Sequence, residues 1–183
     1  MRLKPVLFFL LVGGFAAFLV IRQTKEGQPG MINIGQQAPD FSVETADGEE
    51  LRLSDLRGKL VFLNFWASWC GPCVEEMPDM DLINKAFKGR KFEMVAVSVD
   101  INQKDVRDFY EKYHLTLPSY PDPGRIIANK YHVNMFPETF LIDRNGYVIK
   151  HYIGPEKWAN PQVYARIDGY IKDQETAERA SAQ

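Results

Sequence analysis

The feature that most constrains the fold of this chain is a Cys-x-x-Cys pair placed directly after an apolar run. Residues 60–66 read as a buried strand, and Trp69-Cys70-Gly71-Pro72-Cys73 follows with the only two cysteines among 183 residues. Pro72 suits the first turn of a helix, because its missing N–H would have no partner there. The sequence therefore predicts a strand that delivers Cys70 to the start of a helix, an arrangement typical of thiol-disulfide exchange.

The two cysteines have different expected roles. At a helix N-terminus, unpaired backbone N–H groups and the helix dipole stabilise an anion, so we expect Cys70 to be the attacking thiolate. Cys73, one turn into the helix, is the expected resolving partner in a redox-active disulfide. A purely structural disulfide remains an alternative, although a bridge that closes so short a loop adds little stability.

Neither a metal site nor a cofactor is expected. A structural zinc site normally needs four ligands, and the chain has no second cysteine pair. The three histidines, His114, His132 and His151, lack the paired spacing of zinc ligands. We expect them on the surface and assign them no role.

The N-terminus has the pattern of an export signal. Arg2 and Lys4 precede sixteen uncharged, mostly apolar residues, 6–21, which Arg22 and Lys25 close. We predict that residues 1–25 form an uncleaved signal anchor, a transmembrane helix with its N-terminus in the cytoplasm. The apolar run is shorter than the ~20 residues that usually span a bilayer, so a cleaved signal peptide remains the alternative.

The remaining chain suits a single domain. We expect a polar linker at 26–35, one domain at 36–173 and a polar, frayed tail at 174–183. Without the charges of the N-terminal segment and Glu26, 18 basic side chains remain against 23 acidic ones. This balance argues against nucleic acid, and against an anionic lipid surface as the main partner.

The order of expected elements indicates an α/β fold. Apolar runs and turn residues predict a central mixed sheet flanked by helices, with an N-terminal β-hairpin extension around Asp47-Gly48. A second hairpin is predicted at Asn145-Gly146, and Pro78 is expected to bend the helix that contains it. The predicted strands are 41–44, 50–53, 60–66, 92–99, 139–143 and 147–153, and the predicted helices are 70–88, 105–113, 125–131 and 161–172.

Several motifs together resemble a known family. Residues 65–73, Phe-Trp-Ala-Ser-Trp-Cys-Gly-Pro-Cys, resemble the active site of thioredoxins. The longer pattern is similar to the membrane-tethered TlpA/ResA/CcmG-like extracytoplasmic thioredoxins, in family order over roughly residues 36–155. It consists of Ala-Pro-Asp-Phe at 38–41, Leu-Ser-Asp-Leu-Arg-Gly-Lys at 53–59, Cys-Val-Glu-Glu-Met-Pro at 73–78 and Phe-Pro-Glu-Thr-Phe-Leu-Ile-Asp at 136–143. The resemblance implies a thioredoxin-like fold.

The resemblance also implies site residues around the disulfide. Pro137 matches the cis-proline that lies beside the disulfide in this family, which leaves the backbone of Phe136 to pair with an extended substrate segment. Trp69 is expected to cover the sulfur and to offer an apolar contact to partners. The side chain of Trp66 is expected to pack in the hydrophobic core.

Two acidic residues match family positions. Glu76 and Glu138 are implied to act near Cys73, where a carboxylate accepts or returns the proton of the thiol. From the sequence alone, Glu76 fits a solvated helix position equally well. Asn64 stands where thioredoxins have a buried aspartate, and since an amide does not titrate, this departure favours Glu76 as the proton acceptor.

The function implied is that of a tethered reductase. The Gly-Pro pair between the cysteines is that of reducing thioredoxins, whose reduction potential lies near about −270 mV. Strong oxidants have a reduction potential near about −120 mV. The family implies that the substrates are disulfides of exported proteins, and apocytochrome c is the first substrate to expect. It implies a membrane electron donor as well. It also implies a single-pass protein of the cell membrane with its catalytic domain on the extracytoplasmic side.

Two other classes of protein remain as alternatives. A peroxiredoxin-like peroxidase shares the Ala-Pro-Asp-Phe motif and the fold, but needs a threonine where this chain has Ala67. A Sco-like copper metallochaperone has a Cys-x-x-x-Cys motif together with a histidine. That cysteine motif is one residue longer than the Cys-x-x-Cys motif of this chain.

Overall fold

The centre of the fold is a five-stranded sheet with the strand order β5-β4-β3-β6-β7. β4 runs parallel to β3 and to β5, whereas β6 is antiparallel to β3 and to β7, so the predicted mixed sheet is confirmed. In that order the strands are Ser119–Pro121, Phe92–Ser98, Leu60–Trp66, Glu138–Ile142 and Val148–Ile153.

The computed structural model describes residues 31–44, 48 and 50–181. The chain divides into two units, Met1–Met31 and Ile32–Gln183, and all the named elements belong to the second unit. The predicted anchor at 1–25 and residues 26–30 of the predicted linker lie outside the described residues. In the part of the chain that is described, no helix has the length and apolar character needed to cross a bilayer.

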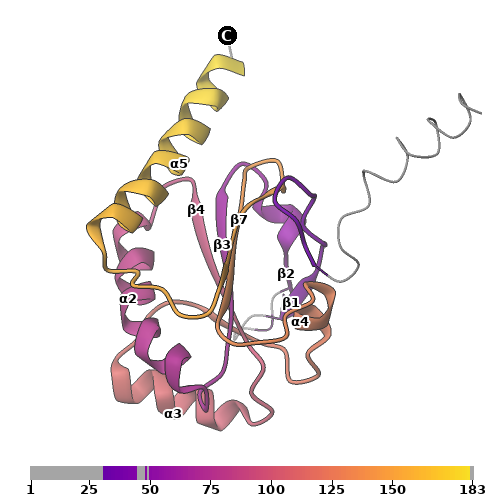
Figure 1. Ribbon diagram of the computed structural model, residues 1–183, viewed down its shortest axis with the longest axis vertical. Helices are drawn as coiled ribbons and strands as arrows, with labels where there is room; N and C mark the ends of the chain where they lie inside the picture. Colours follow the sequence, from indigo (N-terminus) through magenta and orange to yellow (C-terminus); the bar gives the residue numbers. More distant parts are fainter. Residues whose placement is uncertain (1–30, 45–47, 49, 182–183) are drawn as a thin grey trace, which may run out of the picture. The chain divides into compact units, whose positions relative to one another are not determined.

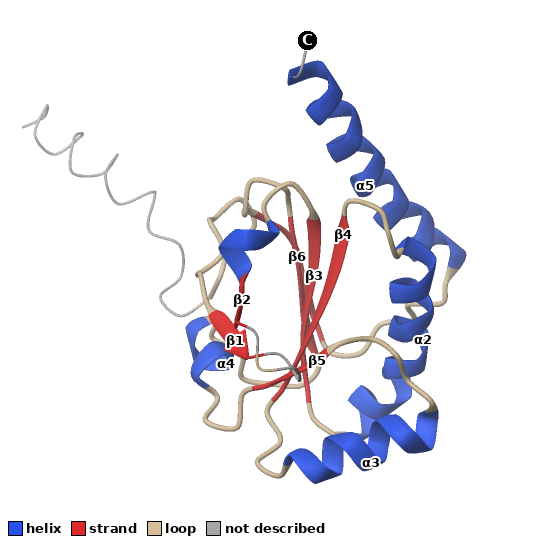
Figure 2. Ribbon diagram, turned by 180° about the vertical axis from the view of Figure 1, so that it is seen from behind, coloured by secondary structure: helices blue, strands red, loops and turns tan. Residues whose placement is uncertain are grey.

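Helices cover both faces of the sheet (Figures 1 and 2). On one face lie α2 (Gly71–Phe87), α3 (Gln103–Tyr113) and α5 (Pro161–Ser181). On the other lie α4 (Ile126–Lys130) and the hairpin of β1 (Ser42–Glu44) and β2 (Glu50–Arg52), which leads into the short 3-10 helix η1 (Leu53–Leu56). Successive right-handed crossovers from β3 to β4 to β5 explain why α2 and α3 share a face.

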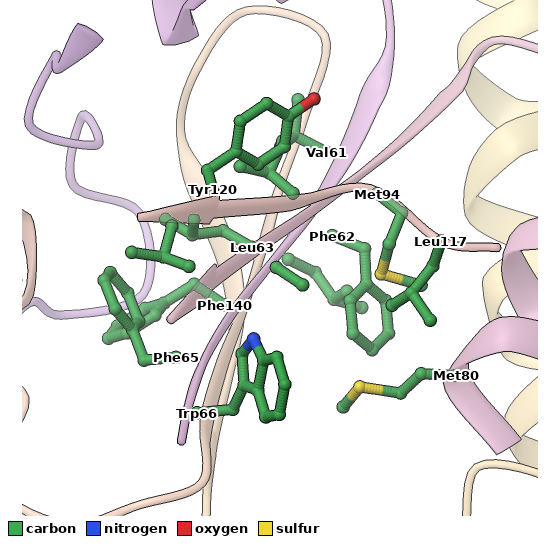
Figure 3. Close-up of a cluster of buried hydrophobic side chains, with 14 of the residues drawn as sticks. Val61, Phe62, Leu63, Phe65, Trp66, Met80, Met94, Leu117, Tyr120 and Phe140 are labelled. Atoms are coloured by element: carbon green, nitrogen blue, oxygen red, sulfur yellow. The ribbon is translucent and has the colours of Figure 1, made fainter. Parts of the chain in front are cut away.

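The core lies on both sides of β3. Every residue of β3 is buried, as expected for a central strand covered by helices on both faces, and this explains its continuous apolar run. Figure 3 shows Phe62, Trp66 and Met80 on the side of α2, and Phe65 with Phe140 on the opposite side. The one polar residue of the strand, Asn64, points to the α2 side, where the site described below lies.

Two differences from the predicted elements have physical causes. Strand β5 was not predicted, because it has only three residues and ends in Pro121, which is tolerated at the edge of a sheet. The last helix was expected to end near Lys172 and to be followed by a frayed tail, but α5 continues to Ser181. Arg90, in the turn before β4, forms ion pairs with Asp168 and Glu175 of this helix.

Candidate active site

The two cysteines form a disulfide at the N-terminus of α2, with their Cα atoms 5.3 Å apart. Cys70 is the N-cap residue, and the backbone N–H of Cys73 donates a hydrogen bond to its sulfur at 3.4 Å. Pro72 occupies the first turn, as predicted. Cys70 is 8% exposed and Cys73 is fully buried, so Cys70 is the one of the two cysteines that reaches the surface.

The loop that carries Cys70 is held by a buried carboxylate. The backbone N–H and the hydroxyl of Ser68 donate to Asp100 at 2.9 and 2.6 Å, and the hydroxyl of Ser98 donates to it at 2.7 Å. Asp100 follows the end of β4, directly beside the end of β3. The sequence reasoning did not identify it, although an acidic residue at the carboxyl end of an adjoining parallel strand is a usable signal.

The loop before β6 lies against the disulfide. The Phe136–Pro137 peptide bond is cis, as the resemblance implied. The carbonyl oxygen of Phe136 is 3.6 Å from the sulfur of Cys70. The ring of Trp69 packs edge-on to the ring of Phe136 with centroids 6.0 Å apart, and Trp69 is 67% exposed. Cys70 therefore lies between an exposed indole and the backbone of the loop before β6.

Exposed apolar side chains stand at this end of the sheet, on three loops and on the first residue of α4. Trp69 follows β3, Ile101 follows β4, Ile126 follows β5, and Met135 precedes β6. Ile101 and Ile126 are 86% and 71% exposed. We call these four residues the apolar rim. The guanidinium carbon of Arg125 lies 5.2 Å from the centroid of the Phe136 ring and adds a cation beside the rim.

Glu76 lies in the core on the α2 side of the sheet, not on the surface. Its Oε2 accepts hydrogen bonds from the indole N–H of Trp158 at 2.9 Å and the backbone N–H of Glu156 at 3.1 Å. Burial raises the pKa of Glu76 to about 7. The hydrogen bonds from these two donors and from the Asn64 amide act in the opposite direction and lower this pKa. Cys73 is three residues earlier on the same helix, and residues at this spacing are neighbours on one face.

Asn64 joins Glu76 to the sheet. Its side-chain amide donates to the hydroxyl of Thr139 on β6 at 2.9 Å and, more weakly, to Oε1 of Glu76 at 3.4 Å. The amide does not titrate, whereas the pKa of the neighbouring carboxyl lies near neutrality. In this cluster Glu76 is therefore the group whose pKa lies near neutral pH.

Glu138 lies on the opposite face of the sheet, beside Phe140. Its Oε1 accepts from the backbone N–H groups of Asn134 and Met135 at 3.2 and 3.3 Å, and its Oε2 lies 2.7 Å from Nε2 of His151. The ring of His151 stacks on Phe140. The geometry thus gives Glu138 contacts that anchor the loop ending at Phe136.

The prediction that the histidines lie on the surface is correct for two of them. His114 and His132 are exposed. It is wrong for His151, which is packed between Glu138 and Phe140, with 11% of its side chain exposed. His151 lies in β7, opposite Phe140, and no local pattern in the sequence indicates that its side chain meets an acidic residue of β6.

Within the described residues, no group of three or more His, Cys, Asp or Glu side chains is placed to hold a metal ion. A groove of about 990 Å³ lies away from the disulfide, between the end of α2, the start of β4 and the end of α5. It is lined by Lys88, Arg90 and Arg179 among others, and contains none of the predicted site residues.

A disulfide at a helix N-terminus, facing a cis-proline loop across the end of a mixed sheet, defines a thiol-disulfide oxidoreductase of the thioredoxin class. The model of the AhpC/TSA family matches residues 34–151. The chain belongs to this family, and within it to the ResA-type thiol-disulfide oxidoreductases, as its relatives show.

Two curated relatives and one solved structure illustrate the similarity. The thiol-disulfide oxidoreductase ResA of Bacillus thuringiensis is 35% identical over 167 residues, with 91% of this chain and 92% of the relative covered. The thioredoxin-like protein YneN of Bacillus subtilis is 39% identical over 155 residues, covering 83% and 89%. A Chlorobium tepidum protein assigned as the thiol:disulfide interchange protein DsbE has a TM-score of 0.67 and 33% identity, covering 78% and 98%. The predicted thioredoxin-like fold and redox enzyme class are confirmed.

Proposed function

We propose that the protein is a membrane-tethered reductase of disulfides in exported proteins, acting outside the cytoplasm, with the Cys-x-x-Cys-His haem site of apocytochrome c as its substrate. The observation that carries the proposal is the asymmetry of the disulfide. Cys70 is the more exposed of the two cysteines, it lies at a helix N-terminus, and the apolar rim lies at the same end of the sheet. An apolar rim of this kind suits a protein segment rather than a small polar disulfide.

The exchange proceeds in two steps that transfer two electrons. The thiolate of Cys70 attacks one sulfur of the substrate disulfide, so that a mixed disulfide forms and the first substrate thiolate leaves. Cys73 then loses its proton and attacks the sulfur of Cys70. This step forms the Cys70–Cys73 disulfide and releases the second substrate thiolate, which leaves the substrate reduced and the protein oxidised.

Glu76 is the proposed proton acceptor for Cys73. Since Cys73 is buried, bulk water has no direct access to its thiol, and the acceptor must lie within the core. Glu76 shares its helix face, and a pKa of about 7 lets the carboxyl take up and return a proton at neutral pH.

The loop before β6 is the proposed docking strand for the substrate. The carbonyl of Phe136 lies beside the sulfur of Cys70, where an extended segment pairs with the backbone by strand addition. Pro137 shapes this loop, Trp69 supplies an apolar contact, and Glu138 anchors the loop through Asn134 and Met135.

The direction of electron flow and the location rest on sequence features. The Gly-Pro pair between the cysteines favours a reducing protein, which in an oxidising compartment needs a membrane electron donor for its own reduction. Residues 1–25 supply the proposed anchor. The relatives named ResA support the exchange chemistry, and the choice of apocytochrome c rests on the family resemblance.

The reduction potential of the Cys70–Cys73 pair tests the direction. We expect equilibration of the full chain with dithiothreitol or glutathione at neutral pH to give a value near or below about −250 mV. A value near about −120 mV would mean that the protein introduces disulfides, and the reductase proposal would be withdrawn.

A trapping variant tests the substrate. In Cys73→Ser the resolving thiol is missing, so we expect a stable mixed disulfide between Cys70 and exported Cys-x-x-Cys proteins, released by dithiothreitol and identified by mass spectrometry. Cys70→Ser is the matched control and should trap nothing. Normal turnover of protein disulfides by Cys73→Ser would contradict the two-cysteine mechanism.

A further inference from the structure

Trp158 lies in the segment between β7 and α5 and is fully buried. Its indole N–H donates to Oε2 of Glu76 at 2.9 Å, which is the shortest of the hydrogen bonds that the carboxyl accepts. The ring packs edge-on against Phe62, with centroids 4.8 Å apart, and against Tyr152, at 5.2 Å. Both the ring and its N–H are therefore fixed beside the carboxyl.

The segment that carries Trp158 is tied to α2 at a second point. The backbone N–H of Ala159 donates to the carboxylate of Asp79 at 3.2 Å, one helical turn after Glu76. Two acidic residues of α2 thus hold consecutive parts of the segment. This attachment fixes the direction of the indole N–H toward Glu76.

Among the residues that the structure describes, few other groups face the carboxyl of Glu76. Asn64 reaches it from β3 at 3.4 Å, and Thr139 of β6 lies behind Asn64. From the segment before α5, Glu156 contributes its backbone N–H and a carboxylate whose negative charge raises the pKa of Glu76. The indole is thus the short-range side-chain donor that stabilises the carboxylate form.

We propose that Trp158 is a positioning residue for the exchange reaction, whose indole N–H stabilises the carboxylate form of Glu76 and so decides the pH above which Glu76 accepts the proton of Cys73. The inference rests on the proposed role of Glu76 in the reaction. It follows because a buried carboxylate that loses one of its donors binds a proton more tightly. Burial and the charge of Glu156 already favour the protonated form, and the donors oppose them.

The test removes the N–H and keeps the ring. In the full chain carrying Trp158→Phe, we expect the Glu76 carboxyl to titrate about one pH unit higher than in the unsubstituted chain. The titration is followed by NMR of ¹³C-labelled glutamate side chains in the disulfide form, with the signal assigned by its loss in Glu76→Gln. The acid limb of the pH profile for exchange should move by the same amount, with unchanged rates well above it.

Trp66→Phe is the matched control. Trp66 is also fully buried, but its indole N–H has no hydrogen-bond partner among the described residues. The same deletion there should leave both the titration and the pH profile in place. A change of fold or packing alone would not separate the two variants in this way.

A readout without any substitution covers the case in which Trp158→Phe does not fold. The indole ¹⁵N–¹H signal of Trp158 should shift with the same midpoint as the Glu76 carboxyl, near pH 7, whereas the signal of Trp66 should not. Two results would overturn the inference: a Trp158 indole signal that does not shift as Glu76 titrates, or a Glu76 titration midpoint that is unchanged in Trp158→Phe. Neither result would contradict the proposed reductase function. A Glu76→Gln variant with the unsubstituted pH profile would instead overturn the proton role of Glu76, and the inference with it.

Discussion

At the scale of single residues, the site separates two tasks between the two sides of the sheet. On the α2 side, Glu76 is buried behind Cys73 with its oxygens held by Trp158, Glu156 and Asn64. On the other side, Glu138 is held by His151 and holds the loop before β6. The first is the carboxyl proposed to exchange a proton, and the second holds the loop whose backbone faces Cys70.

The raised pKa of Glu76 makes a prediction about stability. Folding raises the pKa of this carboxyl from 4.5 to about 7, so the folded state binds its proton more tightly than the unfolded state does. Stability contributed by the protonated group is therefore present below pH 4.5 and lost as the pH rises toward 7. The shift corresponds to about 3 kcal/mol.

Glu76→Gln tests this prediction. The amide keeps the shape and does not titrate, so we expect the free energy of unfolding to change less between pH 4.5 and pH 7 than in the unsubstituted protein. Urea unfolding of the disulfide form at a series of pH values measures it. An identical pH dependence in both proteins would show that Glu76 does not titrate in this range.

At the scale of elements, the sequence predicted those whose signal is local. Strand β3 was predicted with its observed bounds, because a central strand is buried on both faces and reads as a continuous apolar run. The start of α2 followed from Cys70 and Pro72. The position of Glu76 was not decided, because its partner Trp158 lies 82 residues away and only the folded chain brings them together.

The length of α5 was missed for the same reason. Its last turns are polar and read as a tail, but Arg90, 78 residues before Asp168, forms ion pairs with Asp168 and Glu175. Local sequence contains no sign of this partner. The family motifs, by contrast, did predict the cis bond before Pro137, which lies 64 residues after Cys73 in the sequence.

Arg90→Ala tests what extends α5. The ion pairs of Arg90 with Asp168 and Glu175 are partly exposed, so we expect little change in the midpoint of global unfolding. We do expect faster amide hydrogen exchange in the turns after Lys172, because these turns lose their attachment to the start of β4. Lys104→Ala, which breaks an exposed ion pair with Asp108 within α3, is the control and should leave exchange in α5 unchanged.

At the scale of the whole domain, the fold gathers the working parts at one end of the sheet. The carboxyl ends of β3, β4 and β5 and the start of β6 meet there, which is where open α/β sheets bind their ligands. The disulfide, the loop before β6 and the apolar rim all lie at this end. The groove near Lys88 and Arg90 lies elsewhere and shares no residue with the site.

The apolar rim predicts a difference between large and small substrates. In Ile101→Glu/Ile126→Glu we expect kcat/KM for a protein disulfide to fall roughly tenfold, because two charges replace exposed apolar side chains at the end of the sheet that carries Cys70. Reaction with glutathione disulfide should change little. Leu82→Glu, at an exposed position of α2 outside the rim, is the control. Equal losses for both substrates would show that the rim does not contact the protein partner.

The burial of Cys73 has a consequence for how the reduced protein meets electrophiles. Since Cys73 is fully buried, we expect an alkylating reagent to find a single nucleophile, at Cys70. Labelling with iodoacetamide under native conditions then stops at one adduct per chain, and its rate reports the thiolate fraction of Cys70 alone. A covalent inhibitor that reacts at Cys70 and contacts the exposed ring of Trp69 needs no second reactive group, because blocking this sulfur leaves no mixed disulfide for Cys73 to attack.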